Sequence, residues 1–467
     1  MLIVFGDTII LMSDKDNRFD RSKDPYLMWN TWKKESLDKS MNQLWGARKW
    51  LQEKPTAVFF DKSCSDPFPF LSDDVEYKFH LVAVTRNTWQ AASDFFRDSS
   101  GSFMLVSSDK YADVPTTGGP FMVVDNRTKP YVHVYDEATL SLVLGELDTL
   151  PDFIKYLADK EWAVRHGSYE IIPGEEDFLG FYLHERGPVV PNPFLRLAGK
   201  VPKDTEGISV AQGEWSAYIT SGAQEARRRT NVDSYFWDKL IAGFTKPIVA
   251  GTVPNHFDAP ISMHELSVRM LAAEPRHTRA AMSRAYKAKL ERTPSHIRSS
   301  MVFSSHHIPR SCFILLTVPH RQNESADEYR RERLALMQHY ATAAKVRFPQ
   351  FDRFTIIGTE PGGVRIRSED LMTVEIAELS REAELEIRTF MEEHKILTDI
   401  SYNNALVQQA LGKPMPINGS PLRARVRRPG RNEPCGCGSG IKYKKCSLPQ
   451  TQGDITRVPI RRPPPMS

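Results

Sequence analysis

The sequence has few cysteines: five in 467 residues, and three of them lie in one short stretch near the C-terminal end. The other two, Cys64 and Cys312, are far apart in the chain. Two scattered cysteines cannot supply the disulfide framework that is typical of small secreted proteins. The sequence therefore predicts a reducing compartment inside the cell, and we expect a cytoplasmic protein.

Long apolar runs are also missing. No uninterrupted stretch approaches the roughly 18 residues that a membrane-spanning helix needs. The apolar start, from Met1 to Met12, is interrupted by Asp7 and has no basic region before it, so it is a poor signal peptide. We expect no membrane span.

Internal repeats and a complete phosphate-binding loop are absent as well. The glycine-rich turn at 358–363 follows an expected strand, but it lacks the lysine and the following helix of such a loop. We interpret it as a connection. The acidic residues near it, Glu360, Glu369 and Asp370, are expected to form a solvated cluster.

What is present indicates a globular protein with more than one core. Hydrophobic residues make up 40% of the chain and charged residues 26%, and 467 residues are too many for one ordinary core. The pattern of strands and helices predicts a mixed α/β fold: two α/β units, a helical middle region and a short C-terminal motif. We expect these boundaries: an α/β domain at 1–190, a mainly helical region at 191–300, a small α/β unit at 301–411, a linker at 412–429, a cysteine-containing motif at 430–448 and a basic, proline-rich tail at 449–467.

The first domain is expected to open with a tight β-hairpin, whose strands at 2–5 and 8–12 flank the turn Gly6-Asp7. Asp136 is a good N-cap for a helix that begins at Glu137. The remaining elements follow from apolar periodicity: strands at 57–60, 79–84, 102–106, 121–124 and 131–135, and helices at 25–53, 88–97, 150–165 and 175–185.

The second half is expected to be helical first and then to alternate. A proline-rich boundary lies at 188–192, helices dominate 214–291, and an amphipathic run covers 261–289. The adjacent pair His306-His307 is interpreted as part of a polar loop. Beyond it we expect these elements: strands at 313–318, 354–358 and 372–376, and helices at 324–348 and 382–394.

Cys64 lies in a polar segment that follows the expected strand at 57–60, where α/β proteins often build sites. One hypothesis makes it a nucleophile with His80 or His133 as its base. The alternative, a packed loop cysteine, is favoured because nothing in the sequence indicates the pairing.

The net charge of +4 is unevenly distributed. Residues 421–467 hold eight arginines and three lysines against Glu433 and Asp454, a net charge of +9, so the first 420 residues carry −5. A basic tail on a mildly acidic body indicates a polyanionic partner: nucleic acid, ribosome or an acidic protein surface. The alternative is a solvated chain end.

The three clustered cysteines are Cys435, Cys437 and Cys446. Thiolates from two short segments are what a tetrahedral zinc site requires, and the glycines at 438 and 440 allow the chain to turn back between the segments. Nearby lysines offset the charge of the thiolates: Lys442, Lys444 and Lys445.

This stretch resembles the SEC-C motif, the zinc-binding tail described for the SecA preprotein translocase. The shared features are the Gly-Arg-Asn-Glu-Pro lead-in, Cys-x-Cys, the Gly-Ser-Gly turn and the Tyr-Lys-Lys-Cys end. The resemblance implies zinc held by the three cysteines, with Arg431 and the lysines available to a polyanion. It departs at Ser447, where the family has cysteine or histidine, so we expect weaker zinc binding.

The order hairpin, helix, strand in residues 1–60 resembles an incomplete PD-(D/E)XK nuclease core, in which acidic groups hold Mg²⁺ and a lysine orients the attacking water. Lys15 matches the motif lysine, while Ser13 stands at the position of the motif acid. Asp14 is adjacent, but side chains alternate along a strand, so it should point away from Lys15. The first motif aspartate and the preceding helix have no counterpart, because the chain begins at about that point.

Two hypotheses follow. The first is a zinc-binding protein that acts mainly by binding a polyanionic partner. The alternative is an enzyme, an Mg²⁺-dependent nuclease of defence or repair that uses Asp14 and Lys15, with the basic tail holding DNA.

Overall fold

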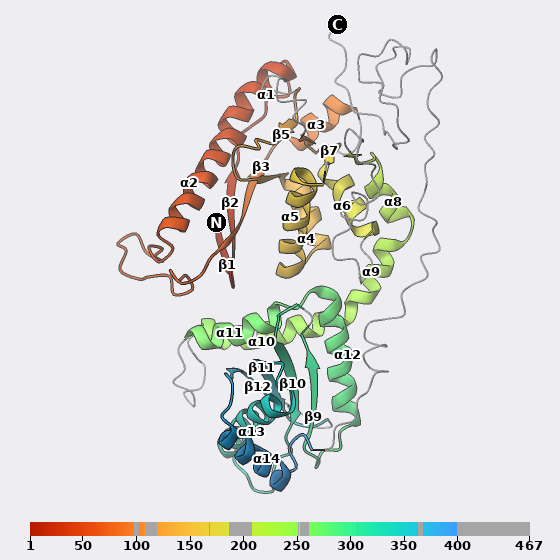
Figure 1. Ribbon diagram of the computed structural model, residues 1–467. Helices are drawn as coiled ribbons and strands as arrows, with labels where there is room; N and C mark the ends of the chain where they lie inside the picture. Colours follow the sequence, from red (N-terminus) through yellow and green to blue (C-terminus); the bar gives the residue numbers. More distant parts are fainter. Residues whose placement is uncertain are drawn as a thin grey trace. The chain divides into compact units, whose positions relative to one another are not determined.

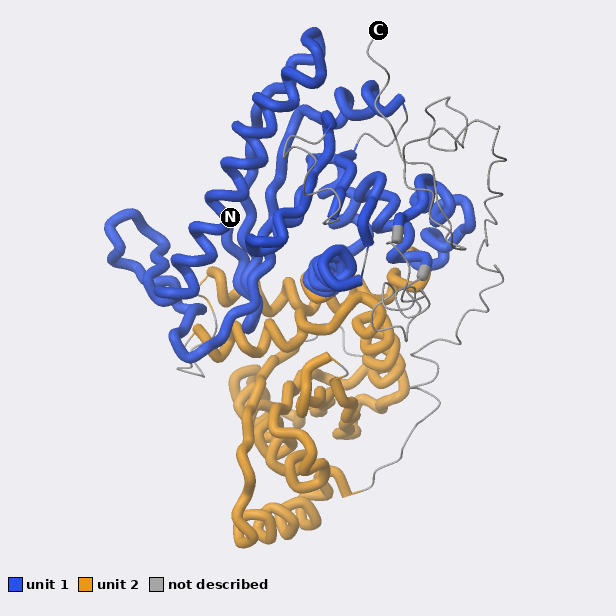
Figure 2. Tube along the Cα trace, turned by 45° about the horizontal axis from the view of Figure 1, so that its top comes forward, with its two compact units in different colours: residues 1–148, 152–227, 416–467 blue, residues 149–151, 228–415 orange. Residues whose placement is uncertain are grey.

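The computed structural model describes residues 1–97, 102–107, 119–167, 169–185, 208–250, 252, 261–305, 307–362 and 368–398. By its contacts the chain divides into two compact units, which Figure 2 colours separately. Among the described residues, the first unit comprises those within 1–148 and 152–227, and the second those within 149–151 and 228–398. The predicted mixed α/β fold is confirmed for the described residues. Three parts of the sequence lie outside the described residues: the expected boundary at 188–192, His306 of the adjacent histidine pair, and everything beyond residue 398.

A four-stranded sheet organises the first unit, with strand order β1-β2-β3-β6. Its strands are β1 (Leu2–Phe5), β2 (Thr8–Lys15), β3 (Lys78–Thr85) and β6 (Val132–Asp136). The predicted hairpin is confirmed: β1 and β2 pair antiparallel, and Gly6 takes a φ of 63° in the turn, which glycine adopts without strain. Because β2, β3 and β6 run parallel, their carboxyl ends meet at one edge of the sheet.

Helices cover both faces of this sheet. The long helix expected at 25–53 is observed as α1 (Pro25–Lys33), a π-helical turn (Lys34–Asp38) and α2 (Lys39–Glu53). Leu44 and Leu51 of α2 pack on one face against residues that include Ile9 and Leu81. The opposite face is covered by α5 (Leu150–Arg165), and Figure 1 shows α2 and α5 on the two sides of the sheet.

A second, smaller sheet completes the first unit, with order β5-β4-β7-β8. The sequence did not predict β7 (Tyr169–Ile172). The predicted cap of α4 (Glu137–Glu146) is confirmed, because the Asp136 side chain accepts hydrogen bonds from the backbone N–H groups of Ala138 and Thr139. The remaining elements are β4 (Met104–Val106), β5 (Met122–Val124), β7 (Tyr169–Ile172), β8 (Ile208–Ser209), α3 (Trp89–Phe96), α4 (Glu137–Glu146), α6 (Glu175–Glu185), α8 (Glu214–Thr220) and α9 (Ala223–Asn231), the last of which crosses into the second unit.

The strand predicted at 57–60 is wrong. This segment makes one isolated bridge, between Phe59 and Pro67, and belongs to a tight loop in which the Asp61 carboxylate accepts hydrogen bonds from the backbone N–H groups of Ser65 and Asp66. Two backbone hydrogen bonds flank this bridge: Phe60 N–H donates to the Asp66 carbonyl and Phe68 N–H to the Val58 carbonyl, both at 2.8 Å. The apolar run therefore pairs with residues 66–68 over a few positions only and forms no strand.

The second unit also contains a four-stranded sheet, with order β12-β11-β10-β9. Parallel strands β10 and β11 form its centre, and β9 and β12 flank them antiparallel. Its elements are α10 (Tyr235–Val249), α11 (Ile261–Ala272), α12 (Arg276–Arg292), β9 (Ser299–Ser304), β10 (Ser311–Thr317), α13 (Ala326–Arg347), β11 (Arg353–Thr359), β12 (Glu369–Glu375) and α14 (Arg381–His394). The amphipathic run expected at 261–289 is therefore two helices, and β9 was not predicted.

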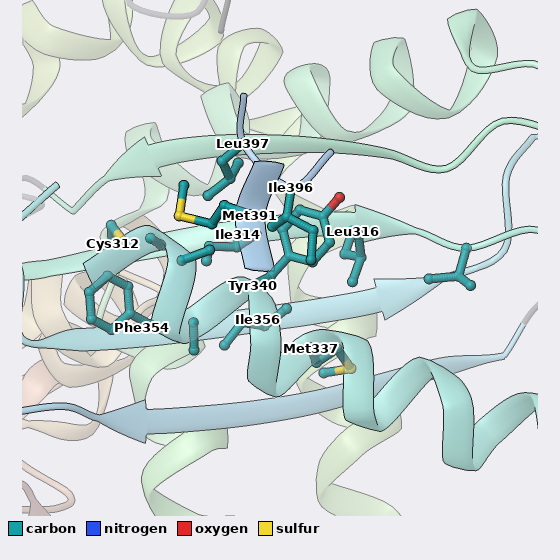
Figure 3. Close-up of a cluster of buried hydrophobic side chains, with 14 of the residues drawn as sticks. Cys312, Ile314, Leu316, Met337, Tyr340, Phe354, Ile356, Met391, Ile396 and Leu397 are labelled. Atoms are coloured by element: carbon teal, nitrogen blue, oxygen red, sulfur yellow. The ribbon is translucent and has the colours of Figure 1, made fainter. Parts of the chain in front are cut away.

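Side-chain alternation along the central strands builds a core on each face of this sheet. Ile314 and Ile356 point toward α13 and α14, where they meet Met337, Tyr340 and Met391 (Figure 3). Their neighbours face α10, α11 and α12: Phe313, Leu315 and Ile357. The apolar run at β10 is thus buried on both sides, as a central parallel strand should be. None of the helices in the described ranges is long and apolar enough to cross a membrane.

The acidic residues near 360–370 are not the solvated cluster that the sequence suggested. Glu360 and Asp370 are only 3% and 5% exposed. Arg333 of α13, which is fully buried, donates to Asp370 Oδ2 from Nη2 at 2.5 Å and from Nε at 2.8 Å. Glu360 lies 3.5 Å from Arg333 and accepts two hydrogen bonds from Ser368. Glu360 and Asp370 therefore belong to a buried ion cluster around Arg333, and not to a solvated surface group.

Replacing Asp370 with asparagine should lower the free energy of unfolding by roughly 3 to 5 kcal/mol, because Arg333 would keep its charge in the interior without its main partner. The matched control is Glu384→Gln, which breaks an exposed ion pair with Arg388 and should cost less than about 1 kcal/mol. Urea denaturation measures the change in the free energy of unfolding for each variant. Equal costs for the two variants would contradict the account.

A second buried carboxyl lies between α11 and α12. Glu274 is fully buried, accepts a hydrogen bond from Ser305 Oγ at 2.5 Å and leaves its Oε2 without a partner. Burial raises the pKa of this carboxyl to about 7, against 4.5 when unperturbed. The folded protein therefore holds Glu274 protonated at acidic pH.

The sign of the resulting pH dependence is fixed by that raised pKa. Below about pH 4.5 Glu274 is protonated in both the folded and the unfolded state, and its contribution to stability is largest. Between pH 4.5 and 7 the unfolded state loses this proton first, so the contribution of Glu274 falls as the pH rises. Over that window the loss attributable to Glu274 should be roughly 3 kcal/mol. Denaturation of Glu274→Gln should lack this slope relative to the parent. The exposed control Glu393→Gln should keep it, and parallel pH profiles for parent and Glu274→Gln would refute the assignment.

Candidate functional site

The carboxyl edge of the first sheet gathers polar side chains from three parallel strands. Asp14 and Lys15 end β2, Arg86 and Asn87 follow β3, and Asp136 ends β6. Parallel strands commonly build binding sites at this edge, because loops after successive strands converge there. The two residues that the sequence suggested as catalytic lie in the expected type of location.

The Asp14 carboxylate forms an ion pair with Arg86. Arg86 donates to both carboxylate oxygens, from Nε at 3.1 Å and from Nη2 at 2.6 Å. These hydrogen bonds lower the pKa of Asp14 below its usual range. Both side chains are about half exposed, so the pair contributes at most about 1 kcal/mol to stability. The carboxylate is ionised and paired with Arg86.

Lys15 and Asp14 point to opposite faces of the sheet. The pairing of β2 with β3 runs without a bulge, with Asp14 opposite Val84 and Lys15 opposite Thr85. Alternation along an unbroken strand therefore separates the two side chains, as the sequence predicted.

The other polar groups at this edge bind one another. Asn87 donates from its side chain to Asp16 at 2.6 Å and from its backbone N–H to Glu137 at 3.1 Å. Asp136 is almost fully buried, and burial raises its pKa to about 6. Arg86, Asn87 and Glu137 carried no motif in the sequence; the signal for them is their position directly after parallel strands.

Among the described residues, the carboxylates at this edge are not part of a cluster of three potential metal ligands. Among the residues that the structure describes, three potential ligand atoms converge in one place, and Asp14, Asp16 and Asp136 are not part of that group. The Mg²⁺-dependent nuclease therefore stays a prediction from the sequence, without support from the arrangement of Asp14 and Lys15.

Cys64 is not placed with a histidine base. It is exposed, in a backbone conformation with a φ of 56°. His80 and His133 are buried, and neither ring nitrogen of His133 has a hydrogen-bond partner. The two imidazoles lie beside each other instead, with ring centroids 6.0 Å apart. The arrangement favours the loop cysteine over the nucleophile.

The residues expected to hold zinc and to contact a polyanion lie outside the described ranges. They are Cys435, Cys437, Cys446, Arg431, Lys442, Lys444 and Lys445.

Comparison with protein families finds the SEC-C motif at residues 431–446. This confirms the resemblance seen in the sequence, and the SEC-C motif is a metal-binding motif whose usual metal is zinc. The match covers a small part of the chain, so it identifies a motif and not a family for the whole. No curated protein and no solved structure matches the chain.

Proposed function

We propose that the chain binds zinc through Cys435, Cys437 and Cys446 and uses the basic residues around them to bind a polyanionic partner. The observation that carries the proposal is the SEC-C match at residues 431–446, which contains three of the five cysteines. Thiolates are soft ligands that zinc prefers, and structural zinc sites are commonly built from such closely spaced cysteines.

The fourth ligand distinguishes this motif from a complete one. Ser447 follows the third cysteine, and a serine hydroxyl is a poor zinc ligand because it is hard and seldom deprotonated. Water completes the tetrahedron in our proposal. Zinc is then held by three protein ligands and binds less tightly than in a four-ligand site.

The partner follows from the charge. Zinc with three thiolates carries one negative charge, whereas Arg431, Lys442, Lys444 and Lys445 bring four positive ones. The motif would lie beyond a linker at 412–429, within a segment of net charge +9. Such a surface attracts nucleic acid, ribosome or an acidic protein by releasing the counterions of the polyanion.

We also propose a cytoplasmic location. Cys64 and Cys312 are free thiols in the structure, one exposed and one buried. Free thiols and thiolate-bound zinc both persist most readily in a reducing compartment.

A thiol-specific mercurial reagent should release zinc from the parent chain but not from the Cys437→Ser variant. The parent chain, purified with zinc under reducing conditions, should release one ion per chain, because the mercurial displaces thiolates from the metal. Cys437→Ser should release none, and the control Cys64→Ser should behave as the parent. A parent that releases no zinc, or a Cys437→Ser variant that still does, would refute thiolate binding.

Binding of a fluorescent RNA or DNA oligonucleotide should weaken steeply with salt. Each phosphate contact contributes about −0.7 to −0.9 to the slope of log K against log salt. Replacing Arg431, Lys442, Lys444 and Lys445 together with glutamine should therefore reduce the magnitude of the slope by roughly 3.

The matched control replaces four arginines outside the motif with glutamine: Arg423, Arg425, Arg427 and Arg428. It removes the same charge, so an equal effect of both sets would assign binding to the whole tail and not to the motif. An acidic polypeptide probe run in parallel distinguishes a protein surface from nucleic acid as the partner.

A further inference from the structure

Three side chains from separate elements meet on the face of the first sheet that α5 covers. His80 comes from β3, His133 from β6 and Glu161 from α5. Val82 pairs with His133 in the parallel register, so His80, two residues before Val82, projects from the same face as His133. All three residues belong to the first compact unit.

Their ligand atoms converge. One imidazole nitrogen from each histidine and one carboxylate oxygen of Glu161 all lie within 4.8 Å of one another. Bonds to a transition-metal ion are about 2.0 to 2.2 Å long, so small side-chain rotations bring all three atoms onto one ion.

The histidines have polar atoms that nothing in the protein satisfies. His133 is fully buried and both of its ring nitrogens lack a hydrogen-bond partner; His80 is 8% exposed and its Nδ1 also lacks one. Leaving a buried polar atom unpaired costs roughly 1 to 3 kcal/mol, and native proteins rarely tolerate several together. Such a group calls for a partner that is not a protein atom.

A proton does not fill this role. Burial lowers the pKa of His80 to about 4, and burial together with the nearby Lys160 lowers that of His133. Both rings are therefore neutral near pH 7, with lone pairs available to a metal. Burial also raises the pKa of Glu161, while Arg165 acts in the opposite direction.

Two cations beside the trio, Lys160 and Arg165, already have partners. Lys160 forms a buried ion pair with Glu175, and Arg165 pairs with Asp125 at 2.8 Å. Arg48 contributes positive charge at longer range, and the Tyr131 ring packs edge-on against His133 with centroids 4.8 Å apart. The nearest cations are thus neutralised locally and leave the Glu161 carboxylate to balance an incoming ion.

We propose that His80, His133 and Glu161 bind a divalent first-row transition-metal ion, with zinc as the best match. Two imidazoles and one carboxylate select such ions over Mg²⁺ and Ca²⁺, which prefer all-oxygen ligands. Three protein ligands leave one position open to water, the arrangement that zinc hydrolases use. Glu161 is the half-buried member of the three. This site is independent of the cysteine motif.

The test uses the full chain with Cys435, Cys437 and Cys446 all changed to serine, which removes the thiolate ligands of the tail. Metal-free protein is titrated with Zn²⁺ and with Co²⁺. One ion per chain should bind, and the Co²⁺ spectrum should show visible ligand-field bands without a sulfur-to-metal charge-transfer band. Mg²⁺ at large excess should not compete.

Ligand variants in the same background locate the ion. His133→Phe keeps an aromatic ring in the apolar interior and should abolish binding; Glu161→Gln, at a half-buried position where misfolding is less of a risk, should weaken it at least about 100-fold. Controls are His184→Phe and Glu53→Gln, both at exposed positions, which should bind as the background does. No bound ion, a charge-transfer band from sulfur, or unchanged binding in folded Glu161→Gln would overturn the proposal.

Discussion

Buried polar and charged groups must find partners, and the interior of each unit is arranged around that constraint. In the second unit the fully buried Arg333 joins α13 to the ends of β11 and β12 through Glu360 and Asp370. In the first unit Lys160 and Tyr156 of α5 both bind Glu175 at the start of α6. These ion pairs and hydrogen bonds link the elements inside each unit: α5 to α6, and α13 to the ends of β11 and β12.

Two neighbouring side chains, His80 and His133, depart from this constraint together. Both ring nitrogens of His133 and Nδ1 of His80 are buried without a hydrogen-bond partner. A metal ion resolves this discrepancy with chemistry that imidazole and carboxylate favour. The chain would then hold metal in two ways: soft thiolates in the SEC-C motif and a harder nitrogen–oxygen site within the first sheet. The carboxyl edge of that sheet, where Asp14 is paired with Arg86, supports neither.

Local signals predicted much of the fold. The hairpin about Gly6, the Asp136 cap and the bounds of α5 and α6 follow from turn chemistry and apolar periodicity. The burial of Asp370 was missed because it depends on Arg333, 37 positions earlier. The expected strand at 57–60 forms only the isolated bridge between Phe59 and Pro67. His80 and His133 meet because β3 and β6 are neighbours in the sheet, although β4 and β5 lie between them in the chain. The sequence does not reveal this pairing. The SEC-C motif was recognisable because all of its features lie within about twenty residues.

X-ray absorption at the zinc edge, on the full chain loaded with zinc, tests the two-site account most directly. Thiolate sulfur lies about 2.3 Å from zinc, and imidazole nitrogen or carboxylate oxygen about 2.0 to 2.2 Å. We predict both shells in the parent, and nitrogen and oxygen alone, with the signature of imidazole, once the three tail cysteines are serine. A parent with sulfur alone, or a cysteine-free tail variant that holds no zinc, would contradict the metal site in the sheet.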